Sequence, residues 1–475
     1  MQVNAQVREG ENALERTLGI LDLINKLPDT FSDDELEGVI DFVHPGLRNT
    51  VLGLFGLEDA RSMEVFFISK IAALFNQARE AKKTGKKVVF IPFTFPPEII
   101  YAFENLIPLS TEVVGGLTVN VCTGQGERYW DFAMSMGLPD SLCSANTITI
   151  GSLCMGNTLR PDAIVSNSVG SCDPNAKIHA FAADYLGIPQ FILEKPTGDS
   201  GREREKYLEY LLALIEELEE FAGERLREDR LREVMQRVYR AAELYHEIWE
   251  LKKARPCPVP NIFNLTFIAT RAQLWGREEA VDIMRRMVDV SRKRMDGERH
   301  DLPEEMVRLY ISYIPFLFDF YGLYSWMEQR GISILGDAIW LQFFPPIDMS
   351  SKKGMLEALA EIAFEFPMTR QMGADSMSVR WLEDICYAVE DLGADGCVYC
   401  GHHACKHAEG TLAHFRREMM KRMKKPTLVL KGDAFDQRIL PIELIHEELE
   451  LFVDKVVARK RKSAVRRRRT KSPQG

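Results

Sequence analysis

The stretch Ala163-Ile-Val-Ser-Asn-Ser-Val-Gly-Ser-Cys172-Asp-Pro174 carries the pattern that decides the fold. Its first four residues are mostly apolar or β-branched, which favours a strand over residues 163–166. A loop of small residues follows, and Asp173-Pro174 is typical of the first turn of a helix. A strand that passes through a short loop into a helix is the unit from which parallel sheets covered by helices are built.

The same strand-then-helix pattern recurs along the chain. In the first half it predicts strands at residues 87–92, 117–121, 163–166 and 190–193, and in the second half at residues 332–335, 396–399 and 427–430. Segments with helical spacing separate these strands. We therefore expect the α/β class, with two Rossmann-like or flavodoxin-like parallel-sheet domains.

The remaining segments differ in composition from these two blocks. Residues 201–255 are mostly Glu, Arg, Lys and Leu with few helix breakers, which predicts two long charged helices. A chain of 475 residues also exceeds what one hydrophobic core usually serves. The predicted organisation is an N-terminal helical region (1–85), a first α/β domain (86–200), a helical insertion (201–304), a second α/β domain (305–457) and a basic, disordered tail (458–475).

Composition limits the partners and the compartment. The chain is 46% hydrophobic, has a formal net charge of −10, and shows neither a secretory signal nor a run of apolar residues long enough to span a membrane. We expect a cytoplasmic protein that binds no membrane and no nucleic acid. Its basic end, from Arg459 to Lys471, is interpreted as a solvated tail, with contact to RNA or an anionic surface as the second interpretation.

The cysteines point to a metal centre. All nine lie between Cys122 and Cys405, and the last three form Cys397-Val-Tyr-Cys400-Gly-His-His-Ala-Cys405. Thiols stay reduced in the cytoplasm, so these cysteines are not a disulfide framework and are free to act as thiolate ligands. Redox chemistry is the function that this pattern favours.

Three cysteines have positions suited to one site. Cys172 precedes a predicted helix start, where backbone N–H groups favour the thiolate, although a lone cysteine there is more often structural. Cys143 lies in a loop of small polar residues, and Cys405 follows the strand predicted at 396–399. Ligands of open α/β sheets gather beyond the carboxyl ends of the strands, so we expect these three cysteines to converge.

A structural zinc site is the alternative for the C-terminal cluster. Its candidate ligands are Cys397, Cys400, His402, His403 and Cys405. Against it, Cys397 and Cys400 belong to an apolar predicted strand and fit the role of buried hydrophobic residues. The other cysteines are expected to be packing residues: Cys122, Cys154, Cys257 and Cys386.

Nucleotide-binding motifs are absent from the sequence. There is no phosphate-binding loop with a Gly-Lys-Ser/Thr ending, and Gly124-Gln-Gly126 lacks the third glycine of a dinucleotide fingerprint. We expect no bound nucleotide in this chain, so that any ATP would have to be used by another protein.

Several segments occur in a characteristic order: Cys143; Ser171-Cys172-Asp173; Gly187-Ile-Pro189-Gln-Phe-Ile-Leu-Glu-Lys-Pro196; Gly393-Ala-Asp-Gly396; Cys405-Lys406; and Lys425-Pro-Thr-Leu-Val-Leu-Lys-Gly-Asp433-Ala-Phe-Asp436-Gln-Arg438. Over residues 86–200 and 305–455 this order resembles the 2-hydroxyacyl-CoA dehydratase and benzoyl-CoA reductase superfamily, in particular its iron–sulfur D-component subunits.

The resemblance implies a ligand set and partners. Cys143, Cys172 and Cys405 would hold a [4Fe-4S] cluster between the two α/β domains, and His402, His403 and Ser171 are candidates for contacts to the cluster or the substrate. A separate ATP-hydrolysing iron–sulfur activator would deliver electrons, and the enzyme would be a homo- or heterodimer of related subunits. Cys397 and Cys400 are candidate additional ligands, as in relatives with a double-cubane [8Fe-9S] cluster.

The implied reaction is the radical dehydration of a 2-hydroxyacyl-CoA thioester. Its β-hydrogen is too weakly acidic for an ordinary base, whereas a ketyl radical formed by one added electron expels the hydroxyl group and acidifies that position. A cluster with three cysteine ligands leaves one iron open as a Lewis acid. The alternatives are an ATP-coupled reductase of the benzoyl-CoA or double-cubane type, and a non-catalytic electron-relay or assembly subunit.

Overall fold

Two four-stranded parallel sheets form the framework, which confirms the expected α/β class. The computed structural model describes residues 31–42, 48–116, 126–156, 158–168, 171–297, 303–319, 321–369 and 378–471, together with Gly19 and Lys26. The first sheet has the order β2-β1-β3-β4, with β1 at Lys87–Ile91, β2 at Leu106–Ser110, β3 at Ala163–Asn167 and β4 at Gln190–Leu193. The second has the order β6-β5-β7-β8, with β5 at Val307–Ile311, β6 at Ile332–Ile334, β7 at Gly396–His402 and β8 at Thr427–Gly432. The two orders are equivalent, although no repeat is visible in the sequence.

Helices cover both sheets. The N-terminal helices are α2 (Asp33–Phe42), α3 (Arg48–Phe55) and α4 (Glu58–Arg79). Those of the first sheet are α5 (Pro97–Tyr101), α6 (Thr111–Val113), α7 (Gly126–Ser135), α8 (Ser144–Cys154) and α9 (Asp173–Leu186). The connecting helices are α10 (Gly201–Ala222), α11 (Glu228–Leu251), α12 (Phe263–Gln273) and α13 (Glu278–Met295). Those of the second sheet are α14 (Gly322–Glu328), α15 (Lys352–Glu365), α16 (Arg380–Asp391), α17 (Lys406–Glu418) and α18 (Ile442–Lys471). None of the helices that the structure describes combines the length and apolar character needed to span a bilayer.

Strands β2 and β5 were not predicted. A strand was expected instead at 117–121, which lies outside the described residues, whereas each of the other predicted strands is found. The segment Leu106-Ile-Pro108-Leu-Ser110 contains a proline, which argues against a central strand. In the structure β2 is an edge strand that pairs only with β1, so the missing N–H of Pro108 falls where no neighbouring strand needs it.

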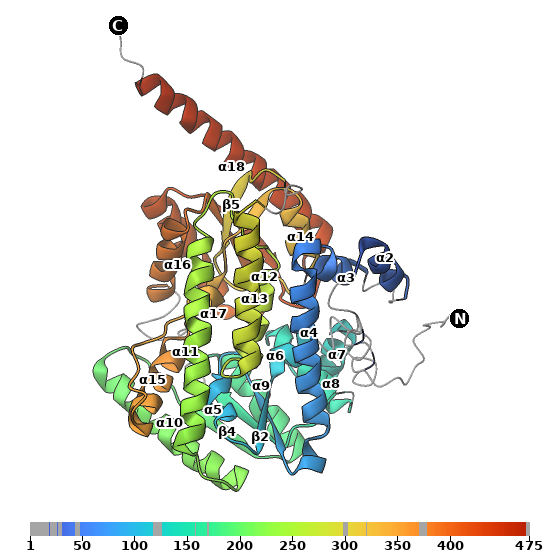
Figure 1. The fold of residues 1–475 in the computed structure, drawn as a ribbon, viewed down its shortest axis with the longest axis vertical. Helices are drawn as coiled ribbons and strands as arrows, with labels where there is room; N and C mark the ends of the chain where they lie inside the picture. Colours follow the sequence, from blue (N-terminus) through green and yellow to red (C-terminus); the bar gives the residue numbers. More distant parts are fainter. Residues whose placement is uncertain are drawn as a thin grey trace.

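The end of the chain is a second difference. The sequence predicted a disordered tail from residue 458, but α18 continues as a helix to Lys471 and projects away from the body of the molecule (Figure 1). Its first half is anchored by the buried side chains of Ile445 and Leu449, and Lys and Arg are good helix formers that extend a helix already begun. The predicted division of the chain into domains stays a prediction.

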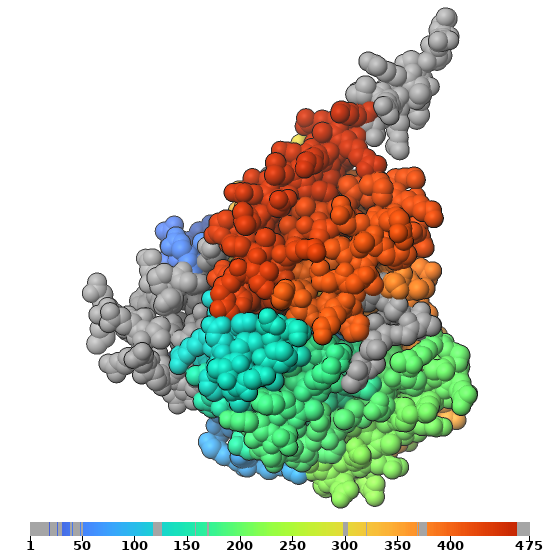
Figure 2. Space-filling model, turned by 180° about the vertical axis from the view of Figure 1, so that it is seen from behind, coloured from blue at the N-terminus to red at the C-terminus, as the bar shows by residue number. Residues whose placement is uncertain are grey.

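The long helices connect the two sheets. In Figure 1, α4, α11 and α13 run along the length of the molecule, with β2 and β4 near one end and β5 near the other. Helix α11 packs against α5 and α15 near the first sheet, and close to its other end Trp249 donates a hydrogen bond to Asp391 (2.7 Å) of α16, which covers the second sheet. The opposite face, in Figure 2, shows the first block in teal and green below the second block in orange and red. The charged insertion therefore braces one block against the other.

Helix α12 is buried along its whole length and is fixed to both sheets by side-chain amides. At its C-terminal end Gln273 accepts a hydrogen bond from Ser110 N (2.8 Å) and donates one to Pro108 O (2.8 Å), both in β2. Just before the helix, Asn261 accepts from Ile334 N (2.7 Å) and donates to Ile332 O (2.7 Å), both in β6. Each amide thus occupies the place that a further strand would take beside an edge strand.

Helix α12 is also held from the side. Thr266 donates a hydrogen bond to the buried Glu64 carboxyl of α4 (2.8 Å), and Arg271 pairs with the buried Glu98 of α5 (3.2 Å). Burial raises the pKa of the Glu64 carboxyl from 4.5 to about 8. The Glu64 side chain is therefore protonated in the folded protein at neutral pH.

Replacing Gln273 by Leu should lower the free energy of unfolding by roughly 2 to 6 kcal/mol, because it leaves two buried backbone groups without partners at about 1 to 3 kcal/mol each. Urea denaturation followed by circular dichroism measures this. The exposed Gln329→Leu is the matched control and should change stability little. Equal effects of the two substitutions would show that the amide contact to β2 contributes nothing.

Glu64→Gln should remove a pH dependence of stability. Between the ordinary carboxyl pKa of 4.5 and the folded value of about 8, the folded state keeps the Glu64 proton and the unfolded state loses it. Stability of the unsubstituted protein should therefore fall as pH rises from about 5 to about 8, more steeply than in the Gln variant. Urea denaturation at both pH values measures the difference, and parallel pH profiles for the two proteins would contradict it.

Candidate functional site

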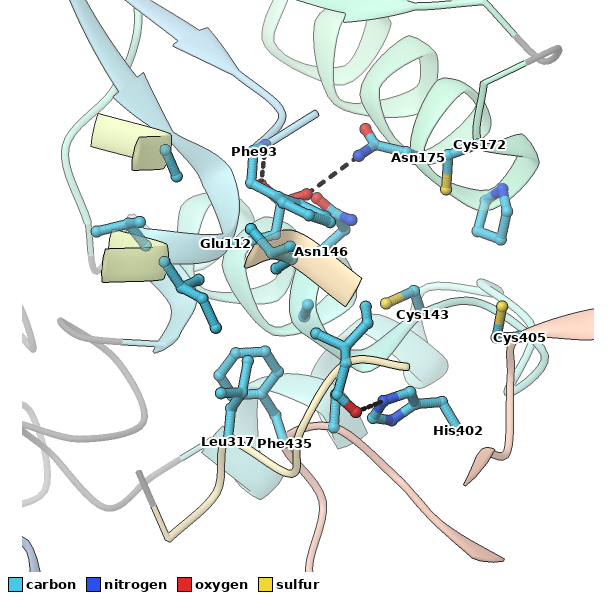
Figure 3. A pocket seen from close by; sticks show the side chains of 18 of the residues that line it. Phe93, Glu112, Cys143, Asn146, Cys172, Asn175, Leu317, His402, Cys405 and Phe435 are labelled. Carbon is cyan, nitrogen blue, oxygen red and sulfur yellow. Dashed lines mark hydrogen bonds between the residues drawn. The ribbon is translucent and has the colours of Figure 1, made fainter. Parts of the chain in front are cut away.

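Three cysteines begin three different helices and line one pocket. Cys143 caps the N-terminus of α8, Cys172 that of α9 and Cys405 that of α17. All three border a pocket between the two blocks, and Figure 3 shows their sulfurs gathered on one side of it. The eight cysteines of the described chain are free thiols. The structure therefore brings together the three cysteines that the sequence analysis selected.

Two of these cysteines occupy equivalent places. Cys172 follows β3 and Cys405 follows β7, and each of these strands is third in the order of its sheet. Cys143 is different, because α7 rather than a described strand precedes it. Of the three cysteines, only Cys172 and Cys405 therefore come after a described strand.

Burial makes the three thiols poor thiolates unless a cation neutralises them. It raises the pKa of Cys143 well above the ordinary value, raises that of Cys172 to about 12, and raises that of Cys405. Nearby negative groups raise the pKa further, chiefly Asp433 at Cys143 and the Cys405 thiol at Cys172, whereas backbone N–H groups at each helix start lower it. No Lys or Arg is among the described residues that line the pocket. A cationic metal centre would supply the missing positive charge.

The candidate donors at the pocket are three thiols, the ligand type that iron–sulfur clusters take. Among the described residues, no three His, Cys, Asp or Glu side chains lie close enough together to hold one metal ion. The sulfurs that hold a cubane stand farther apart, because each binds a different iron. A pocket bordered by three separated thiols is consistent with that larger group.

The zinc site considered for residues 397–405 is not formed. Cys397 and Cys400 are buried in β7, three residues apart, so their side chains point to opposite faces of the sheet. Neither lines the pocket with the other three cysteines. His403 is exposed, and Ser171 is buried outside the described lining of the pocket.

His402 and Tyr313 border the pocket beside Cys405. The Tyr313 hydroxyl lies 3.1 Å from the Cys405 sulfur. His402 Nε2 lies 3.0 Å from the carbonyl oxygen of Ile314, which can only accept, so Nε2 carries the proton. Burial lowers the pKa of His402, which keeps the ring neutral with Nδ1 as an acceptor. Tyr313 was not foreseen from the sequence.

Glu112 is the buried carboxyl of the pocket, and the sequence analysis missed it. It accepts hydrogen bonds from Phe93 N (2.8 Å), the Thr111 hydroxyl (2.9 Å) and Asn175 Nδ2 (3.1 Å). Burial raises the pKa of this carboxyl. Glu112 follows directly after β2, so prediction of that strand would have pointed to it.

The Gly432-Asp-Ala-Phe-Asp-Gln-Arg438 segment closes one end of the pocket. Asp433 accepts from the backbone N–H groups of Phe435 (3.0 Å) and Asp436 (3.2 Å), which turns the chain so that Phe435 lines the pocket. Arg438 pairs with Asp436 (2.6 Å) and reaches Asp131 of α7 (3.0 Å). The motif thus ties the second block to the first beside the site.

Sequence comparison finds relatives of this chain among known proteins. The chain is 22% identical to the (R)-phenyllactyl-CoA dehydratase alpha subunit of Clostridium sporogenes over 384 residues, which covers 76% of this chain and 87% of the relative. It is 20% identical to the (R)-2-hydroxyglutaryl-CoA dehydratase subunit alpha of Acidaminococcus fermentans over 272 residues, 56% of this chain and 54% of the relative. The family model for the 2-hydroxyglutaryl-CoA dehydratase D-component matches residues 92–456, and the chain therefore belongs to that family.

Proposed function

We propose that this chain is the cluster-bearing subunit of a 2-hydroxyacyl-CoA dehydratase, and that Cys143, Cys172 and Cys405 hold a [4Fe-4S] cluster. The observation that carries the proposal is the meeting of three half-buried, helix-capping thiols at one pocket between two α/β blocks. Membership of the dehydratase family supports the reaction class.

The protein's own residues prepare the site in two ways. The N-termini of α8, α9 and α17 direct partial positive charge and backbone N–H groups at the three sulfurs, which stabilises them as thiolates. The Tyr313 hydroxyl adds a polar contact to Cys405. When bound, a cluster with three cysteine ligands supplies one electron and an open iron that acts as a Lewis acid.

Glu112 is assigned to proton transfer. Dehydration removes a hydroxyl group that must leave as water and a hydrogen from the neighbouring carbon, so a group that gains and loses a proton is needed. Glu112 lies in the pocket, and burial raises the pKa of its carboxyl, which favours the protonated form that an acid catalyst needs. Asn175 and Thr111 fix its orientation through the hydrogen bonds described above.

The proposal includes partners and one type of cluster. The two relatives are named as alpha subunits, which supports a complex with a further related subunit. A separate ATP-hydrolysing iron–sulfur activator would supply the electron, since the sequence has no nucleotide-binding loop. A single cubane is favoured over a double-cubane cluster, because Cys397 and Cys400 lie outside the described lining of the pocket. The assembly would work in the cytoplasm.

Cys172→Ser should abolish the visible absorbance of the cluster and most of the bound iron after anaerobic purification. Cys257→Ser and Cys386→Ser are the matched controls, because both thiols are half-buried and lie outside the described lining of the pocket. Iron and sulfide analysis measures the loss, and circular dichroism checks that each variant is folded. Equal iron loss in all three folded variants would reject the ligand assignment.

Glu112→Gln should lower kcat by roughly 10² to 10⁴-fold, the usual contribution of a positioned acid or base. Gln keeps the shape and most hydrogen bonds of Glu but cannot transfer a proton. Iron content should be unchanged, and the exposed Glu104→Gln should behave like the unsubstituted enzyme. The measurement is steady-state turnover of the assembled, activated complex, and a Glu112→Gln enzyme with normal kcat would remove Glu112 from the reaction.

A further inference from the structure

The wall of the pocket away from the cysteines is apolar. Helix α12 contributes Ile268, Ala269 and Ala272 to it, and the loops after β5 and β8 contribute Leu317 and Phe435. In Figure 3, Leu317 and Phe435 are drawn well apart from the three sulfurs, on the other side of the pocket. An acyl chain whose reacting end lies beside the cysteines would therefore extend toward this wall.

None of the side chains in the described lining of the pocket carries a positive charge that could pair with the free carboxylate of a dicarboxylic acyl group. Its ionisable side chains are the three thiols, Tyr313, His402 and Glu112. The Nε2 of His402 is already committed to the carbonyl oxygen of Ile314 (3.0 Å), and the carboxyl of Glu112 repels an anion whenever it is ionised. A carboxylate that enters the pocket would therefore lose its hydration without gaining a cationic partner.

The charged residue of α12 does not alter this conclusion. Arg271 lies between pocket residues in sequence, but its guanidinium is committed to Glu98 (3.2 Å) and to Gln342 (2.9 Å). It does not line the pocket. Freeing it for a substrate would leave the fully buried Glu98 without its counter-ion.

We propose that the acyl group accepted at this site is apolar, of the arylalkyl or branched-alkyl 2-hydroxyacyl class, and that dicarboxylic acyl groups are rejected. The inference rests on the proposed function, because it assumes that the pocket receives an acyl-CoA. One of the two relatives is named for a phenyllactyl thioester and the other for a 2-hydroxyglutaryl thioester. The inference assigns this pocket to the first kind of acyl group. Leu317 is then a specificity-determining residue.

The test is calorimetric titration of the full complex with (R)-phenyllactyl-CoA, (R)-2-hydroxyglutaryl-CoA and free CoA, without activator, so that binding is measured apart from turnover. We expect phenyllactyl-CoA to bind at least ten-fold more tightly than 2-hydroxyglutaryl-CoA. Leu317→Lys should reduce this ratio at least ten-fold by placing a cation at the apolar wall. Leu317→Met keeps the wall apolar, and Ile439→Lys adds the same charge at a largely exposed position, so both should leave the ratio unchanged.

The outcomes of the titration test the apolar character of the acyl site separately from the proposed function. Equal affinity for the two thioesters, or tighter binding of the glutaryl compound, would overturn the apolar assignment and leave the proposed function intact. Binding of neither thioester more tightly than free CoA would overturn the assignment of the pocket to an acyl group altogether. A Leu317→Lys complex that is folded by circular dichroism, yet keeps the original ratio, would remove Leu317 as the determinant of specificity.

Discussion

One buried helix, α12, is tied by side-chain amides to an edge strand of each sheet and so fixes the position of the two edges relative to one another. Segment 261–273 carries an amide at each end, and each amide satisfies one N–H and one C=O of an edge strand. The 11 residues of α12 span roughly 16 Å at about 1.5 Å per residue, so the helix is a spacer of fixed length between β2 and β6. The backbone groups it satisfies are buried, so loosening either end would expose them without partners.

The geometry of the site depends on the length and position of α12. Cys172 belongs to the first sheet and Cys405 to the second, so the separation of their sulfurs is set by how the two sheets are held apart. The same helix supplies one wall of the pocket. The proposed cluster site and the proposed acyl pocket thus both depend on the packing of α12, where Thr266, Arg271 and Gln273 bond to neighbouring polar groups.

The sequence predicted what local patterns can encode. Strand β3, the loop after it and the start of α9 follow from residue types within a dozen positions, so Cys172 was correctly placed at a helix N-terminus. Strand β2 was not predicted because a proline such as Pro108 is tolerated only in an edge strand. Whether a strand lies at an edge is a property of the whole sheet and cannot be read from the local sequence. Glu112 was missed for the same reason, because it comes just after β2. The full burial of α12 could not be read from Asn264, Thr266, Arg271 and Gln273, whose partners lie far away in the chain.

The amides that fix the spacer also seal two sheet edges. An uncovered edge strand presents unpaired N–H and C=O groups that recruit strands from other molecules, which leads to misassembly. At β2 the outward groups are occupied by Gln273, and Pro108 has no N–H to offer; at β6 they are occupied by Asn261. Another subunit therefore cannot extend either sheet by adding a strand at these edges, and has to dock through helices and loops.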